Sequence, residues 1–275
     1  AALALTGILA LSLIIGACGK RKAPLSPNER VSQRSQVSAF QRGSEVRLSW
    51  TLPPRNAAQN SLLNISAVDV YRLAEATSSS QSLTEEEFAA RSTLIATVAV
   101  NDTDFQKKAM NYADQLEFAG NNVRLRYAVR FVNASGSRAA FSNFVLIQPA
   151  NDIATAPTAP TAVTAQDFVK LTWKPPVANI DGTTPPNILG YNVYRSSDGQ
   201  PAALVNKSPI TQSEFEDRTF EFKQSYVYFV RTISVGTDAQ PIESKESELV
   251  SMIPIDTFPP SAPAGITLAA SRSVI

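Results

Sequence analysis

The segment Val46-Arg47-Leu48-Ser49-Trp50 returns later in the chain as Val169-Lys170-Leu171-Thr172-Trp173, and each copy is followed shortly by Pro-Pro. A second pair of segments, 68–72 and 191–195, ends in Val-Tyr-Arg in both copies. Both pairs are displaced by the same number of residues, which indicates a duplication. A period of roughly 100 residues is the size of one domain rather than of a solenoid repeat. The 275 residues are therefore expected to hold about two domains.

Each copy has the alternation that is typical of β-strands. Apolar and polar residues alternate through 169–173 and through 226–231, so that one face of each strand packs inward. Short runs of this kind are separated by Gly, Pro, Asn and Asp turns, such as Ser197-Asp198-Gly199. The pattern predicts an all-β chain of antiparallel sandwiches.

The order of these motifs resembles the fibronectin type III domain: a strand with Trp, Pro-Pro, Val-Tyr-Arg, and then Tyr-x-Val-Arg. The resemblance covers most of the chain. It implies tandem immunoglobulin-like (fibronectin type III) antiparallel β-sandwiches after an N-terminal signal segment. It also implies that the tryptophans fill the cores, with Val70, Tyr127 and Val129 around the first and Val193, Tyr228 and Val230 around the second. The core signature residues are Trp50, Tyr71, Tyr127, Trp173, Tyr194, Tyr226 and Tyr228.

A corner hydrogen bond distinguishes the two copies. In the fibronectin type III family, a tyrosine at the start of the sixth strand commonly makes this bond. The resemblance implies that role for Tyr226 in the second copy. The first copy has Leu125 at that place, so its corner is expected to close by packing alone.

The repeat also sets the domain boundaries. Proline-rich stretches are expected to be extended and fairly stiff, because each proline fixes its own φ. The last segment repeats the way the second domain opens, so we expect poor packing from about Asp256 onward and a further domain after it. The divisions are 1–17, a signal peptide; 18–35, a flexible tether; 36–149, the first domain; 150–160, a linker; 156–254, the second domain; and 255–275, the start of a third.

An uncharged apolar run from Leu3 to Ala17 precedes Cys18, the single cysteine of the chain. A run of this length is shorter than the roughly 20 residues of a membrane span and reads as a secretion signal whose basic n-region is missing. The pattern resembles the lipobox of bacterial lipoproteins, which implies cleavage between Ala17 and Cys18 and a diacylglycerol on the Cys18 sulfur. A core helix with a buried cysteine is the alternative.

The lipoprotein resemblance implies a cell-envelope location and a membrane partner through the lipid on Cys18. Gly19 follows the cysteine, where the family's inner-membrane retention signal usually has Asp, so outer-membrane sorting is expected, facing the periplasm or the cell surface. The basic cluster 20–22 is placed either to touch anionic head groups or to remain a solvated tether.

Composition argues against several functions. There are 25 Lys and Arg against 24 Asp and Glu, so no long-range field favours nucleic acid, and no such partner is expected. The chain has no histidine, which removes the usual general base and metal ligand, so we expect no enzyme activity, no metal and no cofactor. Acidic pairs such as Asp102 and Asp104, or the run 85–87, read as solvated loops, with a carboxylate pair or calcium site as the alternative.

The first copy carries an insert from Leu73 to Ser92. Thr84 and Glu87 have the spacing of a capping box, which predicts a short helix through Phe88. Inserted loops on rigid sandwiches often bind ligands, while others only cover a sheet edge. The candidate binding residues are Thr84, Glu87, Phe88 and Arg91.

Two classes of function remain. The first is a non-enzymatic, lipid-anchored envelope protein whose domains act as spacers or as binding and adhesion modules for protein or polysaccharide. The alternative is the N-terminal anchoring and accessory part of a larger secreted hydrolase whose catalytic domain lies beyond residue 275. Fold-level analogy alone does not name a ligand.

Overall fold

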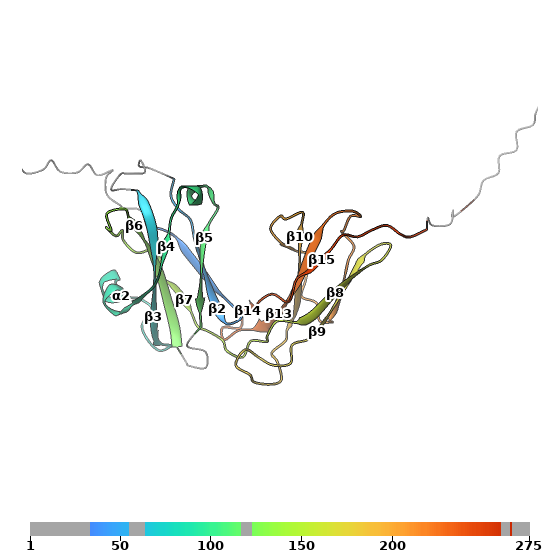
Figure 1. Ribbon diagram of the computed structural model, residues 1–275. Helices are drawn as coiled ribbons and strands as arrows, with labels where there is room; N and C mark the ends of the chain where they lie inside the picture. Colours follow the sequence, from blue (N-terminus) through green and yellow to red (C-terminus); the bar gives the residue numbers. More distant parts are fainter. Residues whose placement is uncertain (1–33, 55–63, 117–122, 260–264, 266–275) are drawn as a thin grey trace, which may run out of the picture.

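The computed structural model describes residues 34–54, 64–116, 123–259 and 265, which form two β-sandwiches side by side (Figure 1). Predictions for the signal peptide, Ala17, Cys18 and most of the tether lie outside the described residues, as does most of the expected third-domain start. Among the described residues, no helix has the length and apolar character that crossing a bilayer requires.

The first sandwich packs a sheet of three strands against a sheet of four, and neighbouring strands within each sheet are antiparallel. The three-stranded sheet has the order β1-β2-β5, and the four-stranded sheet has the order β4-β3-β6-β7. The strands are β1 Val37–Arg42, β2 Glu45–Trp50, β3 Ile65–Ala76, β4 Thr93–Ala99, β5 Met110–Gln115, β6 Val123–Asn133 and β7 Val145–Ile147.

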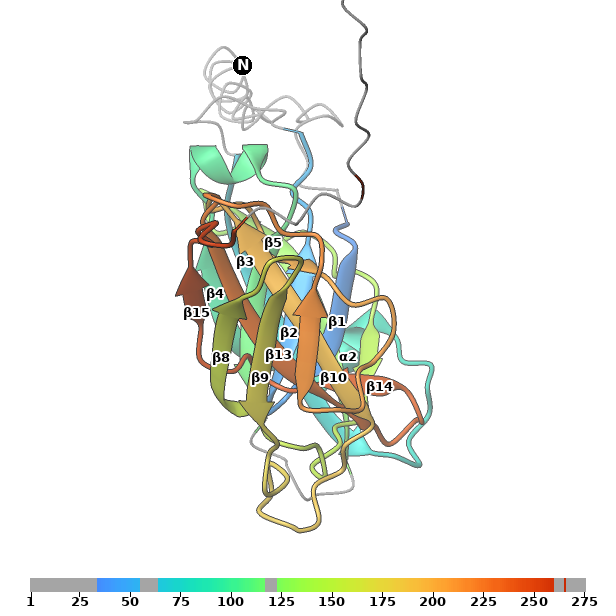
Figure 2. The same cartoon turned by 90° about the vertical axis from the view of Figure 1, so that its right-hand side faces the viewer.

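The second sandwich repeats this arrangement, with β12-β9-β8 in one sheet and β11-β10-β13 in the other, where β15 and β14 also pair with β13. Figure 2 shows its strands in front of those of the first sandwich. The expectation of tandem fibronectin type III sandwiches is confirmed as the fold class. The strands are β8 Thr158–Thr164, β9 Val169–Lys174, β10 Gly190–Ser197, β11 Ala203–Leu204, β12 Glu214–Asp217, β13 Tyr226–Val235, β14 Pro241–Glu243 and β15 Val250–Met252.

One apolar cluster lies between the two sheets of each sandwich. Trp50 is 1% exposed and packs with Val70, Tyr127 and Val129. In the second sandwich, Trp173 is 5% exposed and belongs to the corresponding cluster. The other members named from the sequence lie in that second cluster with it: Val193, Tyr226, Tyr228 and Val230.

Tyr71 and Tyr194 differ from the expectation that they share the tryptophan cores. Each follows a core valine on a strand, and successive side chains of a strand point to opposite faces. Tyr71 therefore lies in a separate apolar cluster on the outer face of the first domain. Tyr194 lies half-buried on the outer face of the second domain, where its ring stacks on that of Phe229.

The corner predicted for the second domain is present. The backbone N–H of Glu221 donates to the Tyr226 hydroxyl at 2.8 Å. In the first domain, Leu125 is fully buried in the core cluster and closes the same corner by packing. The difference between Tyr and Leu at one position thus changes how the two domains hold the same turn.

The predicted helix is also present, as α2 (Glu85–Arg91). The backbone N–H of Glu87 donates to the Thr84 side chain at 3.2 Å, and the Glu87 carboxylate accepts from the Thr84 backbone N–H at 2.9 Å. Further along, a short 3₁₀ helix, η2, spans Asp102–Gln106. The helix α2 carries Phe88 into the apolar cluster that also contains Tyr71.

Candidate functional site at the junction of the two domains

The two sandwiches meet where β1 of the first domain ends beside β14 of the second. The two strands run parallel, with Arg42 opposite Glu243. The backbone N–H of Gly43 donates to the Glu243 carbonyl at 2.8 Å. Backbone hydrogen bonding therefore crosses from the three-stranded sheet of one domain into the sheet of the other.

The segment that joins the domains is packed against both of them. The Gln41 side chain accepts from the Ala150 N–H at 2.9 Å and donates to the Ala150 carbonyl at 2.7 Å, as a neighbouring strand would. Ile153 and Ala154 are fully buried, and the Ala154 N–H donates to the Ser234 hydroxyl at 2.9 Å. The predicted linker 150–160 is thus a docked segment, and β8 begins inside it at Thr158.

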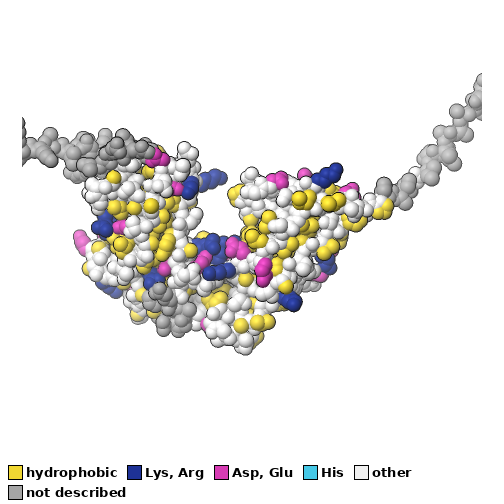
Figure 3. Space-filling view, viewed as in Figure 1, with side chains coloured by type: hydrophobic (Ala, Val, Ile, Leu, Met, Phe, Trp, Pro, Cys, Tyr) yellow, Lys and Arg dark blue, Asp and Glu magenta, His cyan; other side chains and the backbone are white. Residues whose placement is uncertain are grey.

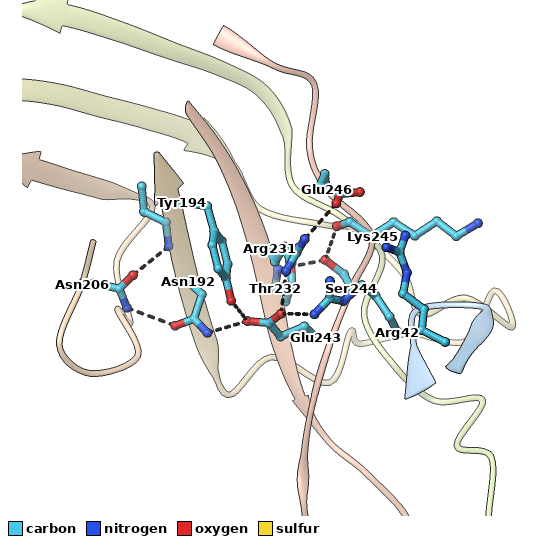
Figure 4. Close-up of polar contacts among 12 residues, drawn as sticks. Arg42, Asn192, Tyr194, Asn206, Arg231, Thr232, Glu243, Ser244, Lys245 and Glu246 are labelled. Atoms are coloured by element: carbon cyan, nitrogen blue, oxygen red, sulfur yellow. Dashed lines mark hydrogen bonds and ion pairs between the residues drawn. The ribbon is translucent and has the colours of Figure 1, made fainter. Parts of the chain in front are cut away.

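Glu243 is the centre of a polar network at this junction (Figure 4). Its Oε2 accepts from Arg42 of the first domain at 3.1 Å and from Arg231 at 3.0 Å. Its Oε1 accepts from the Tyr194 hydroxyl and from the Asn192 amide, each at 2.6 Å. One half-buried carboxylate therefore connects two strands of its own domain with the first strand of the other.

The environment keeps Glu243 ionised. Burial alone would raise the pKa of this carboxyl, but hydrogen bonds from Tyr194, Asn192 and Arg231 outweigh burial and hold the pKa below its usual value. Burial lowers the pKa of Arg42, and the nearby Arg231 guanidinium lowers it further, while Glu243 opposes both effects. The cation of Arg42 is thus crowded by a second cation across the junction.

A second polar contact crosses the junction beside the first. The buried Glu45 carboxylate accepts from Arg47 at 2.7 Å and from Gln115 at 3.1 Å within the first domain. Lys245 of the second domain lies 3.4 Å from the same carboxylate. Together with Glu243, these residues tie the two domains through charged groups that are only partly open to solvent.

The residues proposed from the sequence as a binding loop have structural partners. Phe88 is fully buried, and its ring meets that of Phe141 edge-on with centroids 5.1 Å apart. Thr84 and Glu87 are bonded to each other in the helix cap, and Arg91 is exposed. These residues form α2 and its N-cap, and binding by this loop stays a prediction.

Each sandwich also contains a buried trio of Arg, Asp and Tyr. In the second domain, Asp217 accepts from the Tyr228 hydroxyl at 2.8 Å and from Arg195 at 2.6 Å. Burial raises the pKa of Tyr228, and the Asp217 carboxylate raises it further, so the hydroxyl remains a donor. The trios are Arg72–Asp114–Tyr127 and Arg195–Asp217–Tyr228.

The acidic pair noted from the sequence has local partners. Asp104 accepts from Lys107 at 2.6 Å and from the Asn101 backbone at 2.7 Å. Within the part of the chain that the structure describes, no three His, Cys, Asp or Glu side chains are grouped as metal ligands would be.

The sequence alone did not reveal Arg42, Glu243 or Lys245. The repeat compares equivalent positions of two copies, whereas the junction joins the first strand of one copy, β1, to β14 of the other. The available signal was the Arg-Gly pair at 42–43, because a glycine directly after a strand suggests a backbone with positive φ. Gly43 has a φ of +53°.

No protein-family model matches the chain, and comparison with curated protein sequences gives no match. Among solved structures, a Fn3-like protein from Clostridium thermocellum is 24% identical, covers 34% of this chain and 88% of its own, and has a TM-score of 0.25. A structure described as a myokine is 13% identical and covers 37% of this chain and 98% of its own, with a TM-score of 0.29. The FN1–FN3 domains of chicken CNTN1 are 13% identical and cover 82% of this chain and 68% of theirs, with a TM-score of 0.33.

These likenesses are too distant to carry a functional argument. The assignment of the fold rests instead on the strand order and on the two tryptophan cores. The molecule belongs to the structural class of tandem fibronectin type III-like sandwiches, with its domains joined by a polar junction.

Proposed function

We propose that the chain is a non-enzymatic, lipid-anchored protein of the bacterial cell envelope. Its two domains act together as a rigid spacer that also presents a binding surface to protein or polysaccharide. The observation that carries this proposal is the junction itself. A docked connecting segment, a shared strand pairing and the Glu243 network restrict the angle between the domains, as a spacer of fixed reach requires.

The anchor part of the proposal is supported by the sequence pattern at Cys18 alone. Two or three acyl chains would attach the protein stably, since a single chain binds membranes only marginally. Mass spectrometry of the mature protein tests it, with Cys18→Ser as the matched variant. We expect a lipid-modified N-terminal cysteine in an outer-membrane fraction. An unmodified cysteine would contradict the anchor while leaving the rigid junction untouched.

The spacer part is tested by measuring the angle between the domains. Residual dipolar couplings and small-angle X-ray scattering are expected to fit one orientation in the native chain. Glu243→Gln removes the charge that connects Arg42 to Arg231 and is expected to broaden the distribution of angles. A broad distribution in the native chain would contradict the proposal.

Glu246→Gln is the matched control for this experiment. Glu246 also accepts from Arg231, at 2.8 Å, but both residues belong to the second domain. The control removes a carboxylate three residues away without breaking a bond between domains. Its scattering curve and couplings are expected to match those of the native chain.

The non-enzymatic part is tested with the purified chain. We expect no hydrolysis of peptides, esters or glycosides and no effect of added metal ions, because the sequence offers no histidine base and no cysteine other than Cys18. Turnover by these residues would contradict the proposal. A catalytic domain encoded beyond residue 275 would favour the accessory role in a larger hydrolase.

A further inference from the structure

The outer face of the β1-β2-β5 sheet carries a hollow of about 480 Å³ that opens between the two domains (Figure 3). The register explains its shape. Phe40 lies opposite Arg47, and Arg47 lies opposite Ala113, so a small side chain forms the floor beside a long one. In the next row, Ser49 lies opposite Asn111. These five residues give the hollow an aromatic wall, a cation and two neutral hydrogen-bonding groups, and Arg42 and the Glu45 carboxylate also line it.

Phe40 is available to a ligand. The residue is 46% exposed on the outer face of the sheet. The Arg42 guanidinium lies 5.1 Å from the ring centroid. A flat aromatic face beside cations suits a ring-shaped ligand that has both an apolar face and a negative group.

The charges around the hollow favour an anion. Arg47 uses its Nε to bind Glu45, while its side chain remains 39% exposed. Burial and the nearby Arg231 cation both lower the pKa of Arg42. Of the charged residues that line the hollow, two are cations, Arg42 and Arg47, and one is a carboxylate, Glu45.

The equivalent face of the second domain provides an internal contrast. The repeat places Val163 where the first domain has Phe40, and Lys170 where it has Arg47. Glu214 and Glu216 stand in the places of Asn111 and Ala113, and Lys170 pairs with Glu214 at 3.0 Å. On that face the Arg218 guanidinium covers the Phe168 ring, 5.1 Å from its centroid, and the carboxylates of Glu214 and Glu216 occupy the positions that leave the hollow open in the first domain.

We propose that the hollow binds a carboxylate-bearing sugar of an acidic polysaccharide. The sugar ring lies against Phe40, its carboxylate binds Arg47, and its hydroxyls bond to Ser49 and Asn111. This inference rests on the binding-module part of the proposed function and deepens it by naming the ligand class. Charge-assisted bonds to Arg supply affinity, and the polar pair selects hydroxylated rings.

The test is titration of the full chain with trigalacturonic acid, followed by NMR and calorimetry. We expect saturable binding, with the largest amide shifts at residues 40, 47 and 111. Arg47→Gln and Phe40→Ala are expected to weaken binding about tenfold each, the scale of losing one charged hydrogen bond or one stacked ring. Lys170→Gln and Val163→Ala, the equivalent changes in the second domain, are the matched controls and are expected to leave affinity unchanged.

Three further ligands test whether binding requires the carboxylate, the sugar ring or both. The neutral trisaccharide of galactose tests the need for the carboxylate, and an oligo-glutamate peptide and tripolyphosphate test the need for a sugar. Equal binding of any of them would overturn the sugar assignment, as would absence of trigalacturonate binding. Scattering on the same samples keeps this failure distinct from a failure of the rigid spacer, because the junction contacts do not depend on the ligand.

Discussion

At the scale of single residues, the two domains use one pair of side chains in two ways. Arg130 donates to the Tyr71 hydroxyl at 2.5 Å in the first domain, and this pair lies near the insert. The equivalent pair in the second domain, Arg231 and Tyr194, instead binds Glu243. The insert thus packs against this pair in the first domain, while the junction residue Glu243 contacts the equivalent pair in the second.

The buried trio gives the first prediction. Asp217 is 2% exposed and holds both Tyr228 and Arg195. Asp217→Asn removes the charge that balances Arg195 and is expected to destabilise the second domain by about 3–5 kcal/mol, as breaking a buried ion pair does. Urea unfolding followed by Trp173 fluorescence in a Trp50→Phe background measures it. The exposed Asp167→Asn is the control and is expected to leave the urea midpoint unchanged.

The same trio predicts how stability depends on pH. Burial opposes ionisation of Asp217, but hydrogen bonds from Thr219 and Tyr228 and the charge of Arg195 hold its pKa below the usual value. Because the folded-state pKa is lowered, this carboxylate stabilises the domain above the unfolded pKa of about 3.9 and loses that effect as pH falls through the folded value. We expect the urea midpoint of the second domain to drop below about pH 4, and to drop less in Asp217→Asn. Equal acid sensitivity of the two proteins would contradict this assignment.

At the scale of elements, the sequence predicts contacts between residues that are close in sequence but not contacts with distant residues. The cap of α2 lies within four residues of sequence, so Thr84 and Glu87 predicted it directly. The partner of Phe88 is Phe141, which comes from beyond β6 and carries no signal near the helix. The same holds for Ala150, whose proline-rich surroundings predict an extended chain but not the Gln41 side chain that docks it.

Phe88 supplies the prediction at this scale. Its ring is fully buried under a helix of seven residues, too short to be stable without packing. Phe88→Ala is expected to destabilise the first domain by about 3–5 kcal/mol. Glu86→Ala, on the exposed side of the same helix, is the control. Urea unfolding of the two variants is followed by Trp50 fluorescence in a Trp173→Phe background. Equal urea midpoints would show that the insert does not stabilise the sheet.

At the scale of the whole molecule, a repeat predicts the domains but not how they meet. Trp50 and Trp173 mark equivalent cores, and the alternation around them predicted two sandwiches correctly. The junction depends on Arg42 and Glu243, for which the repeat offers no equivalent pair: the register of the second domain has Ala165 in the place of Arg42. The sequence of one copy therefore contains no template for the contact between copies.

Gly43 tests that junction with a backbone change. Its φ of +53° is one that side chains rarely adopt, and a Cβ there would lie 3.1 Å from the Lys245 backbone nitrogen. Gly136, in the turn after β6, has a φ of +80° but no atom within 4 Å of such a Cβ. Gly→Ala at either position is expected to cost about 1 kcal/mol in the first domain, because both impose a left-handed backbone on alanine.

The two variants are expected to differ in the relation between the domains. Gly43→Ala pushes against the backbone that follows β14, so it should disturb the Gly43 to Glu243 hydrogen bond and broaden the interdomain angle. Gly136→Ala should leave residual dipolar couplings between the domains unchanged. If both variants kept the native couplings, the β1–β14 pairing would not determine the angle between the domains. It would then be a consequence of that angle. The docked segment around Ala150 would then hold the angle by itself, and Gln41→Ala would be the change that releases it.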